Sequence, residues 1–528
     1  MEDKELLEIE NLKVNFYTYQ GIVKALNGID LILNKAETFG LVGETGCGKS
    51  VTAYSILRLL QTPPGRIESG SIYFLEPPEV RAERKRLLAK YIDLSKKELD
   101  KGESGLKFDE PYSLAKHSMK LLSSRTKANP KDPLQSKVRK DAMSFHYDLL
   151  SRSDYYMRQV RGKFISMIFQ EPTSALNPVF KIGDQISEVT LLHKKKEFAK
   201  RVLKEINEEL KSLHGGHEPK TEVGADGRLA CTACGKSVSK YDNWCMACGT
   251  ALEKRRLPAL RRLSLRIYRN IYSDMYYNRE GRIWEYLRKI PLIRRFVSDL
   301  SEGPNRRIFS FYRRVPFLRR YYKLIYREAL KDSAKMLQLT RIPDPIQILD
   351  RYPHELSGGM QQRVMISIAL ACNPKLLIAD EPTTALDVTI QAQILGLMKD
   401  LKQKLGTTIL LITHNLGVVA ETCDRVGVMY AGTMVEIAST KTIFKSPLHP
   451  YTQGLIHAVP SAAVDQKRLY MIEGTVPNLI KPPTGCRFHP RCPKAQGVCE
   501  KLEPRTIEIE PGHLVSCHIF DKGVGYDG

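Results

Sequence analysis

Gly43-Glu44-Thr45-Gly46-Cys47-Gly48-Lys49-Ser50 is the stretch that decides the fold of this 528-residue chain. It follows the pattern G-x-x-x-x-G-K-[ST], in which the glycines let backbone N–H groups surround a chain of phosphates. Lys49 brings a positive charge to the β- and γ-phosphates, and Ser50 offers a hydroxyl to Mg²⁺. The stretch therefore predicts a phosphate-binding loop for a nucleotide such as ATP, against the alternative of a glycine-rich turn without a ligand.

The residues on either side of this loop support the phosphate-binding interpretation. Thr38 to Val42 reads as a buried strand, and Val51 to Leu60 reads as a helix. The N-terminus of such a helix faces the phosphates and favours negative charge, so Val51 is also expected to lie at the nucleotide. This strand–loop–helix order predicts an α/β nucleotide-binding fold.

The composition predicts a globular chain of two to four domains. Hydrophobic residues make up 42% of it, and the mean hydropathy is −0.30. No window approaches the roughly 18 apolar residues of a membrane span. Because the start, Met1 to Leu7, is acidic and lacks an apolar signal core, we expect a soluble protein that stays in the cytosol.

The net charge of +23 is concentrated in two segments. Residues 77–158 hold 19 Lys and Arg against 12 Asp and Glu, and residues 251–330 hold 21 against 7. The remaining residues hold 42 against 40 and are nearly neutral. The basic character therefore belongs to these two segments and not to the whole protein.

The N-terminal region alternates between apolar and polar residues in a way typical of strands. Together with Gly70 to Phe74, four short strands within residues 6–35 predict an antiparallel sheet: Leu6 to Ile9, Leu12 to Phe16, Val23 to Leu26 and Ile29 to Leu33. An aromatic side chain there could stack on adenine; Phe16 is our choice, Tyr17 and Tyr19 are alternatives, and an ordinary sheet aromatic remains possible. The charged, helix-prone stretch that follows predicts an insertion.

A group of four cysteines predicts a zinc site within a second insertion. The spacing is C-x2-C-x10-C-x2-C with a glycine after each pair, from the residues Cys231, Cys234, Cys245 and Cys248. Two such knuckles close a tetrahedral site with no open position, so its role is structural. Unligated thiols are the alternative.

Residues 255–326 are rich in Arg and Tyr, with apolar residues at helical spacing. Basic amphipathic helices contact anionic lipid or nucleic acid. The alternative is a solvated basic face over a small core.

Two further motifs supply groups for nucleotide chemistry. Gln170 ends a predicted strand, where its side chain can ligate Mg²⁺ and contact the attacking water. Ser357-Gly358-Gly359 opens a predicted helix, whose hydroxyl and N–H groups form a second anion site.

Four acidic or basic positions complete the candidate set. The apolar run Leu376 to Ala379 ends in Asp380, which can hold Mg²⁺ through water, and Glu381, which can polarise the attacking water. Asp387 follows at the start of the next segment, and His414 ends another predicted strand, from which it can reach a γ-phosphate.

This ordered set resembles the ATP-binding cassette (ABC) ATPases. Longer motifs narrow the resemblance to the oligopeptide/dipeptide importer branch, namely residues 168–172, 176–178, 352–360, 388–393 and 447–452. The resemblance implies a P-loop NTPase with a RecA-like core, an antiparallel β subdomain and a helical subdomain. Asn415 departs from the family, which usually has Asp after the histidine, and so do the two insertions.

The resemblance divides the chain into six segments. We expect ABC core at 1–76, a charged insertion at 77–158, core at 159–193, a second insertion at 194–330 with a zinc ribbon near 226–252 and basic helices near 255–326, core at 331–445, and a Cys-rich C-terminal domain at 446–528.

That C-terminal segment carries a second group of four cysteines, Cys486, Cys492, Cys499 and Cys517. Their spacing contains no C-x2-C knuckle, so a zinc ribbon is less natural. Four thiolates suit a [4Fe–4S] cluster, and the family resemblance implies one. Zinc and no metal remain open alternatives.

The resemblance also implies a mechanism in which two cassettes pair head to tail. ATP and Mg²⁺ would lie between Lys49, Ser50, Gln170 and Asp380 of one subunit and the signature residues Ser357, Gly358 and Gly359 of the other. Glu381 would act as the base or orient the water, and His414 would hold the γ-phosphate.

The implied partners are a sister ATPase, two membrane permeases and, indirectly, an extracytoplasmic binding protein. A heterodimer is favoured and a homodimer is possible, at the cytoplasmic face of the cell membrane and with possible contact to anionic lipid. Peptides are the default solute, with nickel or oligosaccharides as alternatives. A soluble ABC ATPase acting on nucleic acid or ribosomes is the other hypothesis; the single P-loop and the importer-type tail argue against it, so no nucleic acid is expected.

Overall fold

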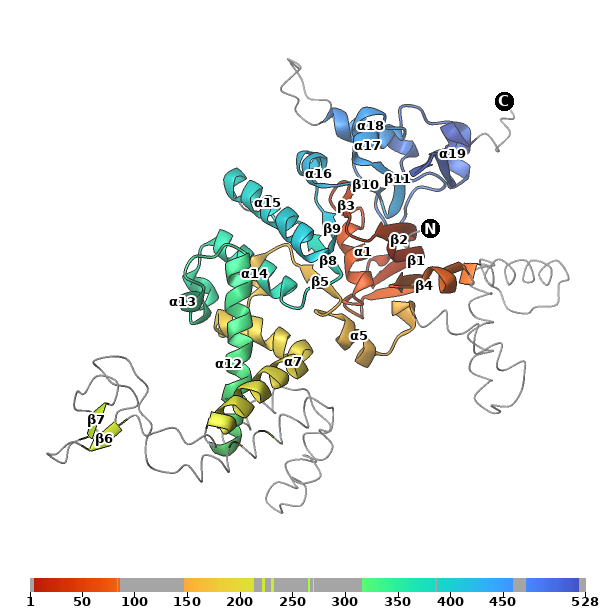
Figure 1. Cartoon of the computed structure of the whole chain (residues 1–528). Helices are drawn as coiled ribbons and strands as arrows, with labels where there is room; N and C mark the ends of the chain where they lie inside the picture. Colours follow the sequence, from red (N-terminus) through yellow and green to blue (C-terminus); the bar gives the residue numbers. More distant parts are fainter. Residues whose placement is uncertain are drawn as a thin grey trace, which may run out of the picture. The chain divides into compact units, whose positions relative to one another are not determined.

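The computed structural model describes residues 4–82, 84–85, 147–212, 221–223, 229–231, 265, 269, 316–384, 387–458 and 472–521. These fall into two compact units (Figure 1). The first unit comprises Met1–Val179, Thr340–Ile342 and Tyr352–Gly528, and the second Phe180–Leu339 and Pro343–Arg351. Three of the predicted zinc ligands, Cys234, Cys245 and Cys248, lie outside the described residues, as does most of the basic segment 255–326.

The main sheet of the first unit has eight strands in the order β12-β13-β11-β10-β3-β9-β8-β5. Its parallel part consists of β10 (Arg425–Tyr430), β3 (Thr38–Val42), β9 (Thr408–Ile412), β8 (Leu376–Asp380) and β5 (Ile165–Ile168). The three central strands are buried along their whole length, which explains their continuous apolar sequences. Because parallel strands end at one edge, the residues that follow β3, β5, β8 and β9 are gathered there.

A second, antiparallel sheet has the order β2-β1-β4, as the alternation predicts. It contains β1 (Glu5–Thr18), β2 (Gly21–Asn34) and β4 (Gly65–Phe74). The sequence indicates four short strands between residues 6 and 35, whereas the structure has two long ones. The break between Ile9 and Leu12 is a register shift and not a turn, whereas the break between Phe16 and Val23 contains the turn that joins β1 to β2.

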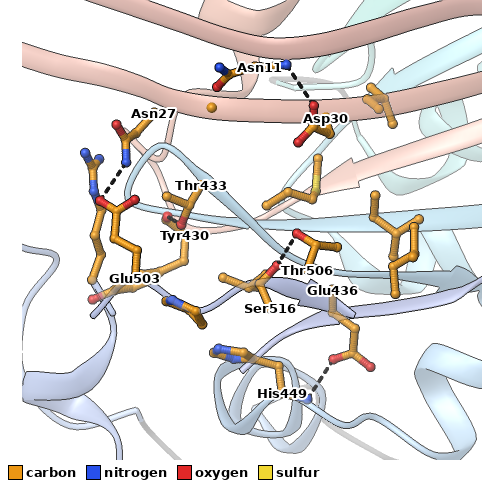
Figure 2. A pocket seen from close by; sticks show the side chains of 18 of the residues that line it. Asn11, Asn27, Asp30, Tyr430, Thr433, Glu436, His449, Glu503, Thr506 and Ser516 are labelled. Atoms are coloured by element: carbon orange, nitrogen blue, oxygen red, sulfur yellow. Dashed lines mark hydrogen bonds between the residues drawn. The ribbon is translucent and has the colours of Figure 1, made fainter. Parts of the chain in front are cut away.

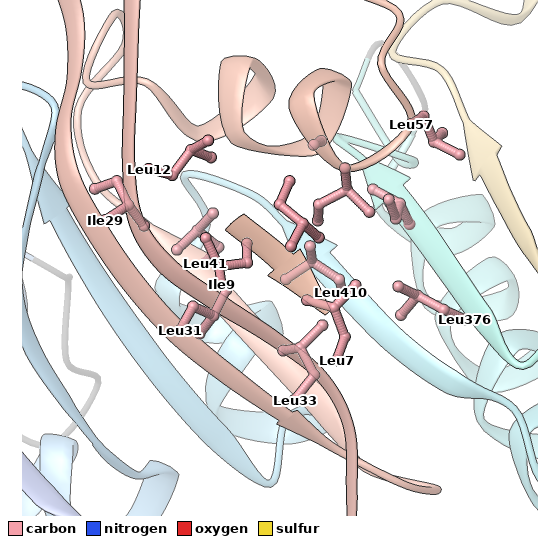
Figure 3. Close-up of a cluster of buried hydrophobic side chains, with 14 of the residues drawn as sticks. Leu7, Ile9, Leu12, Ile29, Leu31, Leu33, Leu41, Leu57, Leu376 and Leu410 are labelled. Atoms are coloured by element: carbon pink, nitrogen blue, oxygen red, sulfur yellow. The ribbon is translucent and has the colours of Figure 1, made fainter. Parts of the chain in front are cut away.

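The hydrophobic core of this unit lies between the two sheets (Figure 3). Buried side chains of β1 and β2, such as Leu7 and Ile29, meet Leu41, Leu376 and Leu410 from the main sheet. The same cluster includes side chains of η3 (Leu149–Ser151) and α5 (Asp154–Val160). The core therefore extends into the C-terminal end of the segment 77–158 that the sequence marks as an insertion.

The N-terminal end of that segment is also tied to the sheet. The Arg84 side chain is 3% exposed and forms ion pairs with Glu8, Glu10 and Glu76 at 2.5, 2.6 and 3.0 Å. Its guanidinium also lies 3.6 Å from the centre of the Tyr73 ring. A buried arginine enclosed in this way requires its carboxylate partners, since an unpaired buried charge is strongly unfavourable.

The C-terminal segment continues the main sheet. β13 (His513–Ser516) pairs with β11 (Thr433–Ser439) and with β12 (Thr506–Glu510). The C-terminal elements lie beside β10 and β11 in Figure 1. They include α17 (Thr440–Lys445), α18 (Pro450–His457), η5 (His489–Arg491), α19 (Gly497–Lys501) and η6 (His518–Phe520).

The remaining helices of the first unit are α1 (Lys49–Ile56), α6 (Pro172–Ala175), η4 (Pro353–Glu355), α14 (Gly358–Leu370), α15 (Val388–Leu405) and α16 (Leu416–Thr422). Of these, α1, α6, α15 and α16 follow β3, β5, β8 and β9, whereas η4 and α14 precede β8. Helix α1 ends before the predicted Leu60, because Arg58 adopts a positive φ of 51° that an α-helix does not allow.

The second unit is built on two long helices, α7 (Ile182–Ser212) and α12 (Pro316–Leu339), with the short α13 (Pro345–Leu349). Phe198, Val202 and Ile325 belong to its buried cluster, and Arg201 pairs with Asp332 at 2.6 Å. A small hairpin, β6 (Thr221–Val223) and β7 (Leu229–Cys231), ends at the first predicted zinc ligand. None of the helices in the described residues is long and apolar enough to cross a membrane.

Candidate active site

The loop 43–50 joins β3 to α1 in a conformation that requires its glycines. Gly43, Gly46 and Gly48 have φ values of 152°, 82° and 102°. A Cβ atom at Gly43 would lie 2.2 Å from the Met429 carbonyl oxygen, so no other residue fits there. The loop therefore keeps its backbone close to the end of β10.

Lys49 points back into this loop. Its Nζ donates hydrogen bonds to the carbonyl oxygens of Gly43 at 2.7 Å and Glu44 at 3.0 Å, and the residue is 6% exposed. The neighbouring Cys47 is buried, and burial raises the pKa of its thiol. The ammonium group thus lies at the centre of the loop, where phosphate oxygens can replace the two carbonyls.

Ser50 and Asp380, two predicted Mg²⁺ ligands, are brought together from distant parts of the chain. The Ser50 Oγ donates to Asp380 Oδ1 at 3.1 Å. Asp380 is buried at the end of β8; burial raises its pKa, the Ser50 hydrogen bond opposes this, and the charge of Glu381 adds to it. A hydroxyl and a carboxylate side by side are oxygen donors of the kind that Mg²⁺ prefers.

Three side chains hold the carboxylate of Glu381. Gln170 Nε2 and Thr384 Oγ1 donate to Oε2 at 3.1 and 3.0 Å, and His414 Nδ1 lies 3.1 Å from Oε1. Burial raises the pKa of Glu381, but the bonds from His414 and Thr384 and nearby positive charge outweigh it, so the net pKa is lowered. The carboxylate is therefore ionised at neutral pH, and His414 Nδ1 must carry the hydrogen.

The backbone at Glu381 is in the left-handed region, with φ of 45°. Its N–H donates to the Ile412 carbonyl at 2.9 Å, which ties the residue after β8 to the end of β9. A non-glycine residue in this conformation costs about 1 kcal/mol, and such strain is concentrated at functional sites. Sequence reasoning predicted Gln170, Glu381 and His414, but it missed Thr384, a common residue type with no distinctive pattern.

The signature residues Ser357-Gly358-Gly359 form the N-terminus of α14, as predicted. The Ser357 Oγ accepts from the Met360 N–H at 3.4 Å, and Ser357 and Gly358 are exposed. Asp387 has the same role at the start of α15, where its Oδ1 accepts from the Ile390 N–H at 2.8 Å. Both are helix caps in this chain, and their contact with a nucleotide stays a prediction.

Comparison with known proteins identifies the family. Residues 26–151 and 269–384 match the ABC transporter family, and residues 435–499 match the C-terminal region of oligopeptide/dipeptide transporters. The probable peptide ABC transporter ATP-binding protein y4tR of Sinorhizobium fredii is 32% identical over 513 residues, which covers 97% of this chain and 94% of that protein. The dipeptide transport ATP-binding protein DppD of Bacillus subtilis is 31% identical over 519 residues, with 98% and 96% covered.

The chain belongs to the oligopeptide/dipeptide importer family of ABC transporter ATP-binding proteins. The resemblance stated from its motifs is confirmed, and so is the expectation of an ABC-type ATPase; the nucleic-acid alternative is not favoured. A solved dimeric ATP-binding cassette bound to ADP and phosphate superposes with a TM-score of 0.39 at 14% identity, covering 82% of this chain and 98% of that one.

The proposed adenine contact of this ABC ATPase involves three aromatic residues of β1 and its turn. Phe16 is half-buried and packs on the core, whereas Tyr19 is 96% exposed. Tyr17 is 45% exposed and donates to Glu68 at 2.7 Å. Stacking of Phe16 on adenine stays a prediction.

Asn415, where the family usually has Asp, has a structural role in this ABC ATPase. Its Oδ1 accepts from the N–H groups of Gly417 and Val418 at 3.0 and 3.3 Å and so caps α16. An Asp side chain would offer the same oxygen. The departure from the family pattern therefore leaves the helix next to His414 capped.

The four C-terminal cysteines of the ABC ATPase lie in one small region. The Cys486 N–H donates to the Cys499 carbonyl at 2.8 Å. Burial, together with the neighbouring thiols, Cys492 included, raises the pKa of Cys486 and Cys517 to about 11. Within the described ranges, no three His, Cys, Asp or Glu side chains form a group that could hold a metal ion.

A separate cavity of about 400 Å³ lies between β1, β2, β10, β11 and the C-terminal segment (Figure 2). It contains none of the predicted nucleotide ligands, although it reaches Cys486. Polar groups along it are paired with one another, as Asn27 is with Glu503 at 3.1 Å and the His449 N–H with Glu436 at 2.9 Å. We therefore assign the nucleotide to the loop at Lys49 and not to this cavity.

Proposed function

We propose that this ABC ATPase powers the uptake of peptides through partner permeases. The observation that carries the proposal is the combination of an intact ATP site with a C-terminal region that matches oligopeptide/dipeptide transporters at residues 435–499. The names of the relatives DppD and y4tR, which refer to dipeptide and peptide transport, support the choice of solute.

In the proposed reaction, the residues around Lys49 bind and position the triphosphate. Lys49 exchanges the carbonyls of Gly43 and Glu44 for phosphate oxygens. Ser50 and Asp380 would hold Mg²⁺, which when bound neutralises charge on the β- and γ-phosphates. Gln170 contributes a further oxygen from its side chain.

Glu381 then acts on the attacking water. Its ionised carboxylate orients the water and accepts a proton from it as the bond from the water oxygen to the γ-phosphorus forms. The bond from the γ-phosphorus to the β–γ bridging oxygen breaks in the same reaction, and ADP and phosphate leave. His414, whose side chain is 61% exposed, donates to Glu381 at Nδ1; with the ring as an imidazolium, its Nε2–H would donate to a γ-phosphate oxygen. Ser357 and Gly358, which are exposed, and the neighbouring Gly359 would serve the nucleotide of a partner cassette.

We also propose that the chain acts within a larger assembly. It pairs with a sister ATPase, contacts two permeases and lies at the cytoplasmic face of the membrane. Uptake then depends on a binding protein outside the cell. The alternative solutes, nickel and oligosaccharides, would use the same cassette, because solute specificity resides in the other subunits.

Two metal sites complete the proposal. Zinc would be bound by Cys231, Cys234, Cys245 and Cys248; the hairpin β6–β7 that ends at Cys231 supports this. A [4Fe–4S] cluster would be bound by the four C-terminal cysteines. Their number and chemistry suit it, although their side chains would have to rotate to reach it, since they form no metal-holding group as they stand.

The decisive experiment is purification of the tagged chain from detergent-solubilised membranes, with mass spectrometry of what accompanies it. Two permeases and a sister ATPase are the expected partners, and the reconstituted complex should import peptides but not nickel or oligosaccharides. A complex of Lys49→Ala is the matched control and should assemble without transport. Recovery with ribosomes or nucleic acid would overturn the proposal.

The metals are tested on the same preparation. Elemental analysis should give one zinc and about four irons per chain, together with the visible absorbance of an iron–sulfur cluster. Cys234→Ser should remove only the zinc and Cys499→Ser only the iron. Absence of either metal from anaerobically purified protein would contradict the corresponding site.

A further inference from the structure

Glu44, the second residue of the phosphate-binding loop, is held by the C-terminal segment. Its carboxylate accepts two hydrogen bonds from Arg491, from Nη1 at 2.8 Å and from Nη2 at 3.1 Å. Its backbone N–H donates to the hydroxyl of Tyr451 at 3.0 Å. Both partners lie more than 400 positions further along the chain.

Arg491 is fixed on its other sides as well. Its side chain is 6% exposed, and its Nε donates to the Glu473 carbonyl at 2.9 Å. Nη1 also donates to the Tyr430 hydroxyl at 3.3 Å. A two-pronged arginine–carboxylate pair in a place sheltered from water is strong and allows one orientation only.

An aromatic cluster of Tyr430, Tyr451 and Phe488 holds these partners in place. The ring centre of Tyr430 lies 4.7 Å from the ring centre of Tyr451 and 5.0 Å from that of Phe488. In the same turn as Phe488, Arg487 donates to the carbonyl oxygens of Ala431 and Lys24. The segment between Cys486 and Cys492 is therefore docked rigidly on the end of β10.

The held residue is directly connected to the phosphate site. The Glu44 carbonyl is one of the two carbonyl groups that accept from Lys49 Nζ, at 3.0 Å. The phosphate-binding loop is also bonded directly to the turn after β10, where the Gly432 N–H donates to the Cys47 carbonyl at 2.9 Å. A shift of Glu44 would displace both the ammonium group and the N–H groups that surround the phosphates.

We propose that Arg491 is a positioning residue for the phosphate-binding loop and sets the affinity of the ATPase for nucleotide through Glu44. Arg491 does not touch the nucleotide itself. Because the loop binds the phosphates in ground state and transition state alike, loss of Arg491 weakens binding more than it slows the chemical step.

The test compares variants of the full-length chain in the assembled transporter. Arg491→Ala should raise KM for ATP about 10-fold and lower kcat by about 2-fold or less, with Mg-ADP binding weakened to a similar extent as KM is raised. Arg491→Lys should recover part of the affinity, because it keeps the charge but loses the fork. The matched control is Arg505→Ala, an exposed arginine of the same segment, which should leave both constants unchanged.

A double-mutant comparison separates positioning from a general structural role. In the Glu44→Gln background, which should itself raise KM in the same direction, Arg491→Ala should add almost nothing. Circular dichroism and the melting temperature show whether each variant is folded; if Arg491→Ala does not fold, Arg491→Lys and Glu44→Gln decide.

Three outcomes would overturn the proposal. One is an unchanged KM in folded Arg491 variants. Another is a fall in kcat with KM unchanged. The third is an Arg491→Ala effect of the same size whether or not Glu44 is present.

Discussion

Glu381 combines three properties of a general base: it is ionised, held in one orientation and only 16% exposed. Its donors come from three different places in the chain, Gln170, Thr384 and His414. Because the pKa of this carboxyl is lowered, it stays ionised down to pH values below its usual 4.5. A fall in activity between pH 8 and 6 must therefore come from other groups.

The first prediction concerns Glu381→Gln. An amide of the same shape cannot accept a proton, so hydrolysis should fall about 100-fold or more while ATP still binds. Phosphate release and nucleotide binding measured on the same preparation check this. Hydrolysis above about a tenth of the wild-type rate would be incompatible with Glu381 as the base.

Asn415 departs from the family pattern, but its side chain keeps the hydrogen bonds that cap a helix. Its side chain caps α16 through Gly417 and Val418. We predict that Asn415→Asp leaves the free energy of unfolding within about 0.5 kcal/mol of the wild type, because Asn and Asp cap equally well. Asn415→Ala should lower it by about 1 kcal/mol. Chemical denaturation distinguishes the two, and equal effects would contradict the assignment of the cap.

At the scale of elements, α18 is anchored by a buried histidine at its N-terminus. His449 is 1% exposed, and its Nδ1 accepts from the Tyr451 N–H at 3.1 Å. Burial lowers the pKa of His449 to about 3. Nearby, Glu436 accepts the His449 N–H and contacts His513, and the Phe488 ring covers the imidazole.

This arrangement makes stability depend on pH in a defined direction. In the unfolded chain His449 has its ordinary pKa of 6.5, so its contribution is fully present above pH 6.5 and is lost as the pH falls toward 3. We predict that the wild type loses about 1 kcal/mol more than His449→Asn between pH 7.5 and 5.5. Asparagine keeps a helix cap but cannot take up a proton; parallel pH profiles of unfolding for the two proteins would count against the prediction.

For the molecule as a whole, the fold does not explain why the positive charge of the chain is concentrated in two segments. The segment 251–330 holds 21 basic and 7 acidic residues, whereas the chain outside this segment and 77–158 is nearly neutral. We predict that the full-length chain co-sediments with vesicles of about 30% anionic lipid and is released by about 0.5 M salt. Equal binding to neutral vesicles would contradict an electrostatic contact.

A charge-matched pair of variants locates that contact. Replacing Arg294, Arg295, Arg313 and Arg314 by Gln should weaken vesicle binding several-fold. Replacing four lysines of the other basic segment, Lys96, Lys97, Lys101 and Lys107, changes the net charge equally and should have a smaller effect. A larger effect from the lysines would place the contact in residues 77–158.

Local patterns predicted most of the residues that the structure gathers at one edge of the main sheet, and their contact with a nucleotide stays a prediction. Lys49 follows from the phosphate-loop pattern. A run of apolar residues that ends in a polar one marks a strand of a parallel sheet and the side chain at its carboxyl end, which applied to Gln170, Asp380 and His414. Ser50 and Asp380 were both predicted as Mg²⁺ ligands from their side-chain chemistry, and the structure brings them together although 330 positions separate them. The same local signal misplaced the strands of 6–35, because a bulge and a turn break the alternation in the same way.

Sequence patterns alone were enough to identify the family, to place the strand and loop of residues 38–50 with a helix after them, and to select the residue types expected to act on ATP. The pairing of arginines with carboxylates became visible only in the folded chain: Arg84 pairs with Glu76 in the sheet, and Arg491 with Glu44 in the phosphate-binding loop. The physical reason is that periodicity and backbone preference are local, whereas an ion pair 447 positions apart depends on the path of the whole chain. The residues around Arg491, which precedes Cys492, do not indicate that its partner is Glu44.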